Sequence, residues 1–286
     1  MSGRWLGIDF SGDYRRWSVG TTKSNVWVAT VEESNGLKLK DLKQPQQLTG
    51  SGTPFERLIA LLSERDFDAA AIDAPFSVPQ EYVPNGSHGE LLELVGNIPR
   101  EGTRAFPSRK ALLDALSKKG FPLSPRKQYR QTDRYWLAQG VGVRPPLWNG
   151  ARPGAPMTAA CLTLLYRSGC PIWPWSNSSK KGLLVEAFPA AQLRTWSMKF
   201  ERYNGSSSER QEIREEIVDA VVKRVKVSLD FIKKMRESAD ALDAVVCSFA
   251  AIAVTRNQVA FPPQYPEAHA EGWISVMRNH ARWHQG

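Results

Sequence analysis

Four carboxylates in this 286-residue chain stand at the end of, or within, apolar runs, where an unpaired charge is costly to bury. Asp9, Asp73 and Glu186 each close a run of three or four mainly apolar residues, and Asp243 lies within the longer run 239–246. Acids from distant parts of a chain can be neutralised together when they share a divalent metal ion. The pattern therefore predicts that several elements of one fold bring these acids to a common site.

The hydrophobic periodicity predicts the order of the elements. Strands are expected at 4–10, 16–22, 25–32, 69–73 and 182–188, and helices from Pro54, from Pro189, over 208–237 and over 239–254. This order indicates an α/β fold that opens as an antiparallel meander. The acids then lie at strand ends, the usual place for a site in such a sheet.

Composition predicts a soluble globular protein, with 42% hydrophobic and 23% charged residues. We expect one domain over residues 1–286, with a Pro-, Gly-, Arg- and Trp-rich insertion at about 80–180. The three cysteines are odd in number and form no CxxC motif, which favours a reducing cytoplasm. Neither a signal segment nor a membrane span is expected, because the longest apolar stretch, 244–254, is too short to cross a bilayer.

The positive charge is concentrated in one segment. The chain has a formal charge of +9, and residues 100–136 hold ten basic residues against three acidic ones, a local charge of +7. Such a field predicts a phosphate-rich partner, DNA or RNA. The expected phosphate and nucleic-acid ligands are Arg104, Arg109, Lys110, Arg126, Lys127, Arg130, Arg134 and Trp136. Ion pairing of Arg130 and Arg134 with Asp133, and packing of the tryptophans, are the alternatives.

The final helix carries two acids on one face. Asp240 and Asp243 are spaced i, i+3, which places their Cβ atoms roughly 5–6 Å apart. We expect Asp9, Asp73 and Asp243 to be catalytic. Together with Glu186 and Asp240 they are the expected ligands of Mg²⁺ or Mn²⁺, and two such ions would support phosphodiester cleavage.

Each acid but one also has an ordinary structural explanation. On these explanations, Asp9 would open the Ser11–Gly12 turn, Asp73 would cap the loop at Ala74-Pro75, and Glu186 would pair with an arginine at the sheet edge. Asp240 is favoured at a helix N-terminus by the helix dipole. Asp243 lies deeper in its apolar stretch and lacks such an explanation, so it is the stronger candidate of the helix pair.

Six short motifs resemble one family in their order along the chain. They are Gly7-Ile8-Asp9-Phe10-Ser11-Gly12, Ala71-Ile72-Asp73-Ala74-Pro75, Arg130-Gln131-Thr132-Asp133-Arg134, Val185-Glu186-Ala187-Phe188-Pro189, Asp240-Ala241-Leu242-Asp243-Ala244 and Glu271-Gly272-Trp273-Ile274. The chain resembles the predicted RNase H-like nucleases grouped as domain of unknown function four-two-nine. The resemblance implies an RNase H-like mixed sheet flanked by helices.

Similarity to Holliday-junction resolvases of the RuvC type implies the roles of the acids. An acid on the first strand, another on the fourth and a pair on the last helix would hold magnesium. In this chain these are Asp9, then Asp73 or Glu186, and then the pair Asp240 and Asp243. Resolvases of this type usually carry Glu at the second position, where Asp73 has a shorter reach.

The sequence thus predicts a metal-dependent nuclease that hydrolyses phosphodiester bonds. One alternative is an actin-like or sugar-kinase-like phosphotransferase, although residues 71–75 lack the glycine pair of its second phosphate loop. The other is a non-catalytic module that binds nucleic acid through the basic segment. The type of nucleic acid, the mode of cleavage and the oligomeric state have no signature in the sequence.

Overall fold

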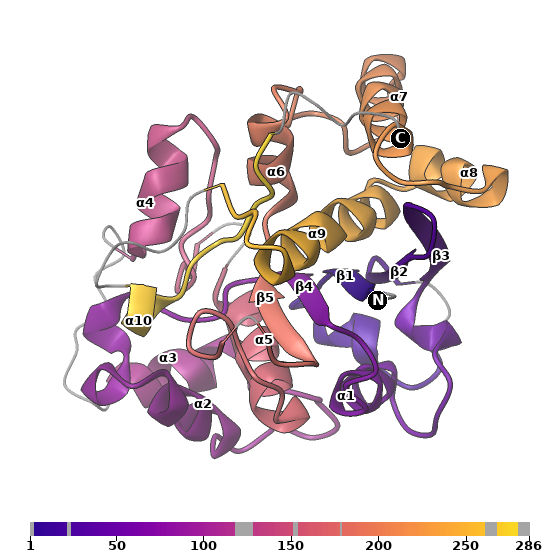
Figure 1. Ribbon diagram of the computed structural model, residues 1–286. Coiled ribbons are helices and arrows are strands. Elements are labelled where there is room, and N and C mark those ends of the chain that lie inside the picture. The colour runs from indigo at the N-terminus through magenta and orange to yellow at the C-terminus, as the bar shows by residue number, and fades with distance from the viewer. Residues whose placement is uncertain are drawn as a thin grey trace.

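A mixed sheet of five strands forms the centre of the protein (Figure 1). The computed structural model describes residues 3–21, 24–117, 128–150, 154–177, 179–260 and 268–279. The strands are β1 (Arg4–Asp9), β2 (Trp27–Glu33), β3 (Leu37–Lys43), β4 (Ala69–Asp73) and β5 (Leu183–Glu186). Their order is β3-β2-β1-β4-β5, with β1, β2 and β3 antiparallel and with β4 and β5 parallel to β1. This confirms the expected α/β fold.

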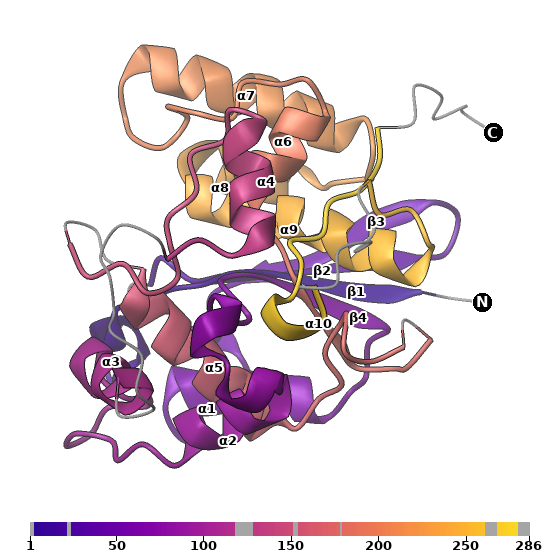
Figure 2. The same ribbon diagram turned by 90° about the vertical axis from the view of Figure 1, so that its left-hand side faces the viewer.

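Helices cover both faces of the sheet (Figure 2). One face is packed by α1 (Pro54–Ser63), α2 (His88–Gly96), α3 (Arg109–Ser117) and α5 (Ala155–Ser168). The other is packed by α6 (Pro189–Thr195), α7 (Ser208–Val222), α8 (Leu229–Glu237) and α9 (Ala239–Thr255). At one end of the sheet, α4 (Gln131–Ala138) lies beside α6 and contacts the short α10 (Ala268–Glu271). No single helix in these described ranges combines the length and the apolar character needed to cross a bilayer.

Strand alternation assigns each side chain of β1 to one of these two cores. Leu6 and Ile8 are buried against the α1 and α5 side, and Trp5 is buried against the α9 side. Since side chains alternate along a strand, Gly7 and Asp9 also face α9. The first acid is therefore directed toward the helix that carries Asp240 and Asp243.

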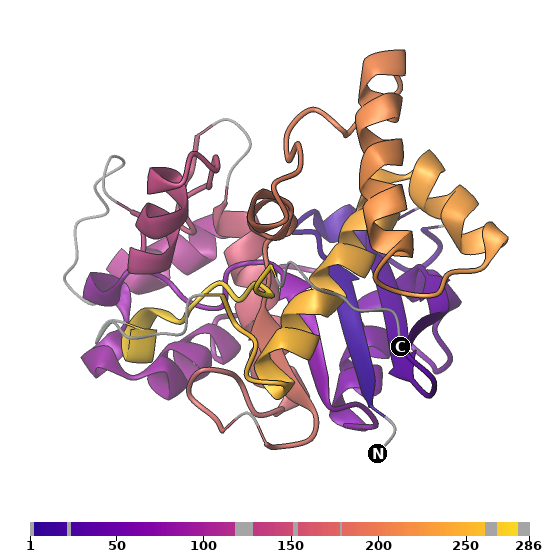
Figure 3. The same cartoon turned by 45° about the horizontal axis from the view of Figure 1, so that its top comes forward.

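Helix α9 lies directly on the sheet (Figures 1 and 3). It contacts β1, β4 and β2, and it approaches the backbone of β1 closely at Gly7. A Cβ atom placed on Gly7 would lie 2.0 Å from the Ala244 carbonyl oxygen and 2.5 Å from the Ser248 amide nitrogen. Only glycine permits this contact between helix backbone and strand backbone.

Two expected helix starts are confirmed by their N-caps. Thr53 accepts a hydrogen bond from the Glu56 amide at 3.2 Å, and the Glu56 carboxylate accepts one from the Thr53 amide at 2.9 Å, which completes a capping box. Ser238 accepts a hydrogen bond from the Ala241 amide at 3.2 Å, so α9 begins as expected.

The opening segment differs from the expected meander. The strand expected at 16–22 was wrong, because residues 14–17 form a 3-10 turn capped by Asp13. The buried indole of Trp17 donates to the Ser11 carbonyl oxygen at 2.8 Å and holds this turn against the core. The third strand of the meander is instead β3, whose residues alternate between buried and exposed positions.

The helix expected over 208–237 is two helices. The chain leaves α7 after Val222 and forms a bridge between Lys226 and Lys38 on β3 before α8 begins. The Lys226 amide donates to the Leu37 carbonyl oxygen at 2.8 Å, and the Leu39 amide donates to the Lys226 carbonyl oxygen at 2.9 Å. Pairing at the edge of the sheet satisfies backbone groups of β3 that would otherwise be exposed, and it interrupts the helix.

Residues 80–180, expected to be an insertion, contribute α2, α3, α4 and α5. Helix α5 shares one hydrophobic core with Ile8 and Ile72 of the sheet, so this segment completes one layer of the fold. Ten of its 14 residues are buried, which leaves it little polar face. An apolar helix of this kind has weak periodicity, and the sequence therefore did not reveal it.

The contact at Gly7 leads to the first prediction. Gly7→Ala should lower the free energy of unfolding by about 1–3 kcal/mol or more, because the added methyl group meets backbone atoms that cannot rotate away. The matched control is Gly142→Ala, where the added Cβ atom has no neighbour within 4 Å. Urea denaturation of both variants measures the difference. Equal stability of the two variants would contradict the close packing of α9 on β1.

Candidate active site

Two acids end neighbouring parallel strands in register. Asp9 on β1 is aligned with Asp73 on β4, as Ile8 is with Ile72. The carboxyl ends of parallel strands meet at one edge of a sheet, and aligned residues share a face. Both acids therefore lie on the α9 side, where Asp9 is 8% exposed and Asp73 is partly accessible.

The N-terminal turns of α9 bring the other two acids to this edge. Asp240 lies in the first turn and Asp243 one turn later, both partly accessible. The Tyr203 hydroxyl donates to Asp243 Oδ1 at 2.8 Å, which orients this carboxylate. We call Asp9, Asp73, Asp240 and Asp243 the carboxylate cluster.

The electrostatics show that members of the carboxylate cluster repel one another. Burial is the main cause that raises the pKa of Asp9 well above its ordinary value, and the charges of Asp243, Asp240 and Asp73 add to it. Burial also raises the pKa of Asp243 strongly, with further contributions from Asp73 and Asp240 that the Tyr203 hydrogen bond opposes. These acids are thus close enough to interact although they come from three elements.

Two arginines lie within electrostatic reach of the carboxylate cluster. Burial, followed by the charge of Glu186, raises the pKa of Asp73 to about 7, while Arg144 opposes the increase. Burial likewise raises the pKa of Asp240, and Arg16 opposes it. Arg16 and Arg144 were not expected at the site. Neither lies in a motif that marks such a role, since only the folded loops bring them near.

The donor set of the carboxylate cluster suits a hard divalent cation. It offers carboxylate oxygens, the ligands that Mg²⁺ and Mn²⁺ prefer, and their mutual repulsion favours a bound positive charge. Among the described residues, however, no three His, Cys, Asp or Glu side chains are gathered tightly enough to hold one ion as they stand. The acids fit a metal by their chemistry, and shared coordination would require their side chains to approach one another.

Glu186 is directed to the other face of the sheet from the carboxylate cluster, although its charge acts on Asp73. It is aligned with Ile72, whose side chain packs on the opposite face of the sheet from α9. Its carboxylate accepts hydrogen bonds from the Arg130 guanidinium at 2.6 and 2.7 Å and from the Phe76 amide at 3.0 Å. In the structure, Glu186 therefore forms the ion pair with an arginine that was the alternative to a metal ligand.

Arg130 is at the centre of a buried ion-pair network. It is 1% exposed, and besides Glu186 its guanidinium donates to both carboxylate oxygens of Asp133, at 2.9 and 3.1 Å. A further contact of 3.4 Å joins it to the Glu271 carbonyl oxygen. Arg130 thus has a structural role in this arrangement and does not present its guanidinium to a phosphate.

The other expected phosphate ligands differ in accessibility. Arg109, Lys110 and Arg134 are exposed and Arg104 is partly exposed, whereas Trp136 is buried, with only 1% of its surface exposed. Arg126 and Lys127 lie outside the described residues. The Arg104 guanidinium stacks over the Tyr14 ring at 4.2 Å, so part of the basic segment contacts the turn that follows β1 and Asp9.

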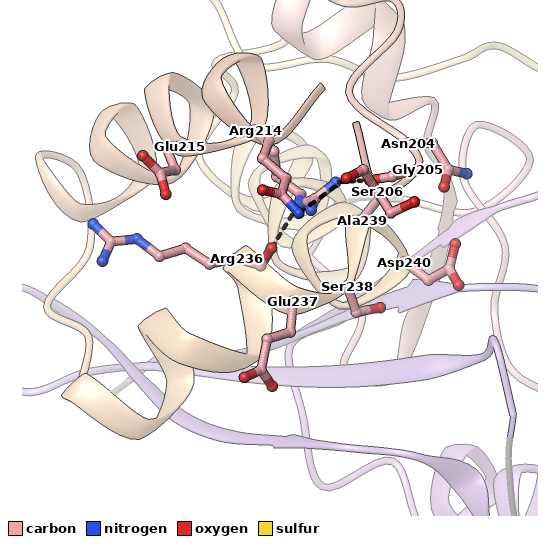
Figure 4. A pocket seen from close by; sticks show the side chains of 11 residues that line it. Asn204, Gly205, Ser206, Arg214, Glu215, Arg236, Glu237, Ser238, Ala239 and Asp240 are labelled. Atoms are coloured by element: carbon pink, nitrogen blue, oxygen red, sulfur yellow. Dashed lines mark hydrogen bonds between the residues drawn. The ribbon is translucent and has the colours of Figure 1, made fainter. Parts of the chain in front are cut away.

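A cavity of about 640 Å³ borders the carboxylate cluster at Asp240 (Figure 4). The buried Arg214 guanidinium lies among its lining residues and donates to the Tyr203 and Gly205 carbonyl oxygens, at 2.6 and 3.0 Å, and to that of Arg236 at 2.7 Å. Arg214 thereby joins the end of α8 to the loop that carries Tyr203. No sequence motif marked Tyr203 or Arg214, because both act through residues distant in sequence.

The buried network leads to a prediction on stability. Arg130→Met should lower the free energy of unfolding by about 3–5 kcal/mol, because it leaves Glu186 and Asp133 buried without their cation. The control is Arg134→Met, an exposed position on α4, the helix that follows Arg130, expected within about 0.5 kcal/mol of wild type. Urea denaturation near neutral pH measures both variants. A mild effect of Arg130→Met would argue against the ion pairs.

The raised pKa of Asp73 predicts how stability depends on pH without divalent metal. Between its ordinary value of 3.8 and about 7, the folded chain keeps a proton that the unfolded chain has released. Asp73 therefore makes the fold less stable as pH rises through this range. In EDTA, the free energy of unfolding of Asp73→Asn relative to that of wild type should increase by roughly 1–4 kcal/mol between pH 4 and pH 8. A difference that does not change with pH would contradict the raised pKa.

Comparison with known proteins identifies a family. The sequence matches the family model described as "Protein of unknown function (DUF429)" over residues 7–268, from β1 to the start of α10. No curated protein and no solved structure matches the chain. The family match covers most of the sequence and includes the whole carboxylate cluster. The chain therefore belongs to the family of proteins of unknown function DUF429.

Proposed function

We propose that this protein is a divalent-metal-dependent nuclease with an RNase H-like fold. The observation that carries the proposal is the carboxylate cluster, in which acids from β1, β4 and α9 converge at one edge of the sheet. Mutually repelling carboxylates destabilise a fold and are retained where they serve a ligand or a reaction. The mixed sheet with helices on both faces is consistent with an RNase H-like arrangement.

The positions of the acids support this function further. The resemblance to RuvC-type resolvases implies an acid on the first strand, another on the fourth strand and a pair on a late helix. Asp9 on β1, Asp73 on β4 and the α9 pair correspond to these positions. Between the two candidates for the fourth-strand acid, the strand register favours Asp73, because Glu186 lies on β5 and pairs with Arg130.

The carboxylate cluster would hold Mg²⁺ or Mn²⁺, which supplies an activated water and stabilises the leaving oxygen when bound. Tyr203 would keep Asp243 oriented through its hydrogen bond. Arg16 and Arg144 would attract the phosphate backbone to the edge of the sheet. The exposed residues Arg109, Lys110 and Arg134, with Arg104, would hold more distant parts of the strand.

The proposal predicts cleavage that depends on metal and on the carboxylate cluster. A labelled panel of single-stranded and duplex DNA, RNA, hybrid and branched junctions is incubated with Mg²⁺ or Mn²⁺. Loss of a residue that only orients a metal ligand typically lowers activity roughly 10–100-fold, and Tyr203→Phe should lower the cleavage rate within that range. Asp9→Asn and Asp243→Asn should each lower the cleavage rate by a larger factor. The control variant is Asp230→Asn, an exposed acid on α8, which should cut like wild type.

The alternatives give different results in this assay. Nucleic-acid binding that EDTA leaves unchanged, with no cleavage of any substrate, would indicate the non-catalytic module. Thermal stabilisation by ATP without cleavage would indicate a phosphotransferase. Cleavage that survives in folded Asp9→Asn and Asp243→Asn would show that another site is responsible.

A further inference from the structure

A second cavity borders the carboxylate cluster at Asp73. Its volume is about 280 Å³, and it lies between the end of β4, the turn from β5 into α6, and the loop 142–144. Asp73 and Arg144 belong to its lining, so the cavity opens beside the proposed reaction centre. The reaction itself does not require a cavity of this kind.

One part of the lining of this cavity is apolar. Val143, Met157, Phe188 and Ile274 contribute to it, and Ile274 is 3% exposed whereas the other three are partly accessible. Apolar and aromatic walls of this type hold flat ring systems through stacking and burial. A bare phosphate group or a hydrated cation would gain little from such walls.

The polar part of the lining is rigid and offers hydrogen-bond acceptors. Glu186, Asp133 and Arg130 line the cavity, and they are each at most 2% exposed. The five N–H groups of the Arg130 guanidinium are directed to Glu186, Asp133 and the Glu271 carbonyl oxygen. The carboxylates retain acceptor capacity, because Glu186 Oε1 and Asp133 Oδ1 each receive one of these bonds. A ligand with N–H groups on its edge would match this surface.

The size of the cavity limits the ligand to one ring system. Pockets for drug-sized ligands measure roughly 300–1,000 Å³, and this cavity lies just below that range. A purine or pyrimidine base fits this volume better than a complete nucleotide. The sugar and phosphate would then stay outside, next to Asp73 and Arg144.

We propose that this cavity receives one unstacked, amino-bearing base of the nucleic-acid strand whose backbone lies at the carboxylate cluster. The inference rests on the proposed function and adds to it a substrate class, namely strands in which a base can leave the stack. Single strands, mismatches and branch points release a base at the lowest cost, so they should be preferred over regular duplex.

The test uses the fluorescence of 2-aminopurine, an amino-bearing base that brightens when it leaves its stacked neighbours. A single 2-aminopurine within a single-stranded oligothymidine is bound by the full chain in EDTA, so that no cleavage takes part. Wild type should raise the fluorescence at least about twofold at saturation. Thymine lacks an amino group, which favours the probe base in the cavity.

The variant that blocks the cavity is Gly142→Trp. Gly142 lines the cavity, and an added Cβ atom there has no neighbour within 4 Å, so a large side chain can be introduced without displacing the fold. It should abolish the fluorescence rise while binding of the oligonucleotide, measured by anisotropy, stays within about threefold. Gly142→Ala should respond like wild type. Gly89→Trp, at an exposed glycine of α2 outside this cavity, controls for the introduced indole.

The outcomes separate the cavity from the nuclease. A rise that persists in Gly142→Trp, or that is absent from wild type although the oligonucleotide binds, overturns the base pocket. Saturable binding of free 2-aminopurine riboside with a dissociation constant equal to that of the oligonucleotide would assign the cavity to a free ligand and overturn the strand proposal. A response lost only in Gly142→Trp supports the pocket even if no substrate is cut, in which case only the nuclease proposal fails.

Discussion

The contact of α9 with β1 at Gly7 determines where the acids of this protein lie. Because Gly7 has no side chain, the backbone of the helix at Ala244 and Ser248 lies directly on the strand. Asp243 stands one residue before Ala244, and Asp9 stands two residues after Gly7 on the same face of the strand. A bulkier residue at position 7 would separate the helix from the sheet and would move Asp243 away from Asp9. The geometry of the carboxylate cluster is thus a consequence of packing between two backbones.

The carboxylates on the two faces of the sheet have different electrostatic surroundings. On the α9 face, charges within the carboxylate cluster add to the burial that raises the pKa of Asp9 and of Asp243, and the Tyr203 hydrogen bond opposes the increase at Asp243. On the other face, Glu186 is neutralised by Arg130 within a network that also includes Asp133. Burial also raises the pKa of Glu186, but Arg130 opposes that increase, whereas neighbouring acids add to the increase at Asp9 and Asp243. This contrast is the main physical reason to assign a function to one group and a structural role to the other.

Local sequence signals predicted much of the fold. The expected helix starts at Pro54 and at residue 239 depend on local contacts, because Thr53 and Ser238 cap them through bonds to amides only three residues away. The ends of β1 and β4 followed from apolar runs that each close with an acid. Helix α5 was missed because it is buried on nearly all sides, and the break after α7 was missed because it depends on pairing with β3. Each missed feature is decided by a neighbour that is distant in sequence.

The sequence by itself determined which residues are acids at the ends of apolar runs, and that Asp240 and Asp243 share a helix face, because both properties follow from spacing within one element. Only the tertiary structure decided which of these acids meet. The register between β4 and β5 aligns Glu186 with Ile72, so a shift of one position relative to Asp73 places its side chain on the other face. The burial of Arg130 beside it, and the approach of Arg16 and Arg144 to the carboxylate cluster, likewise depend on long-range packing. Side-chain direction in a sheet has a period of two residues, and no local pattern reports the register between strands joined by long connections.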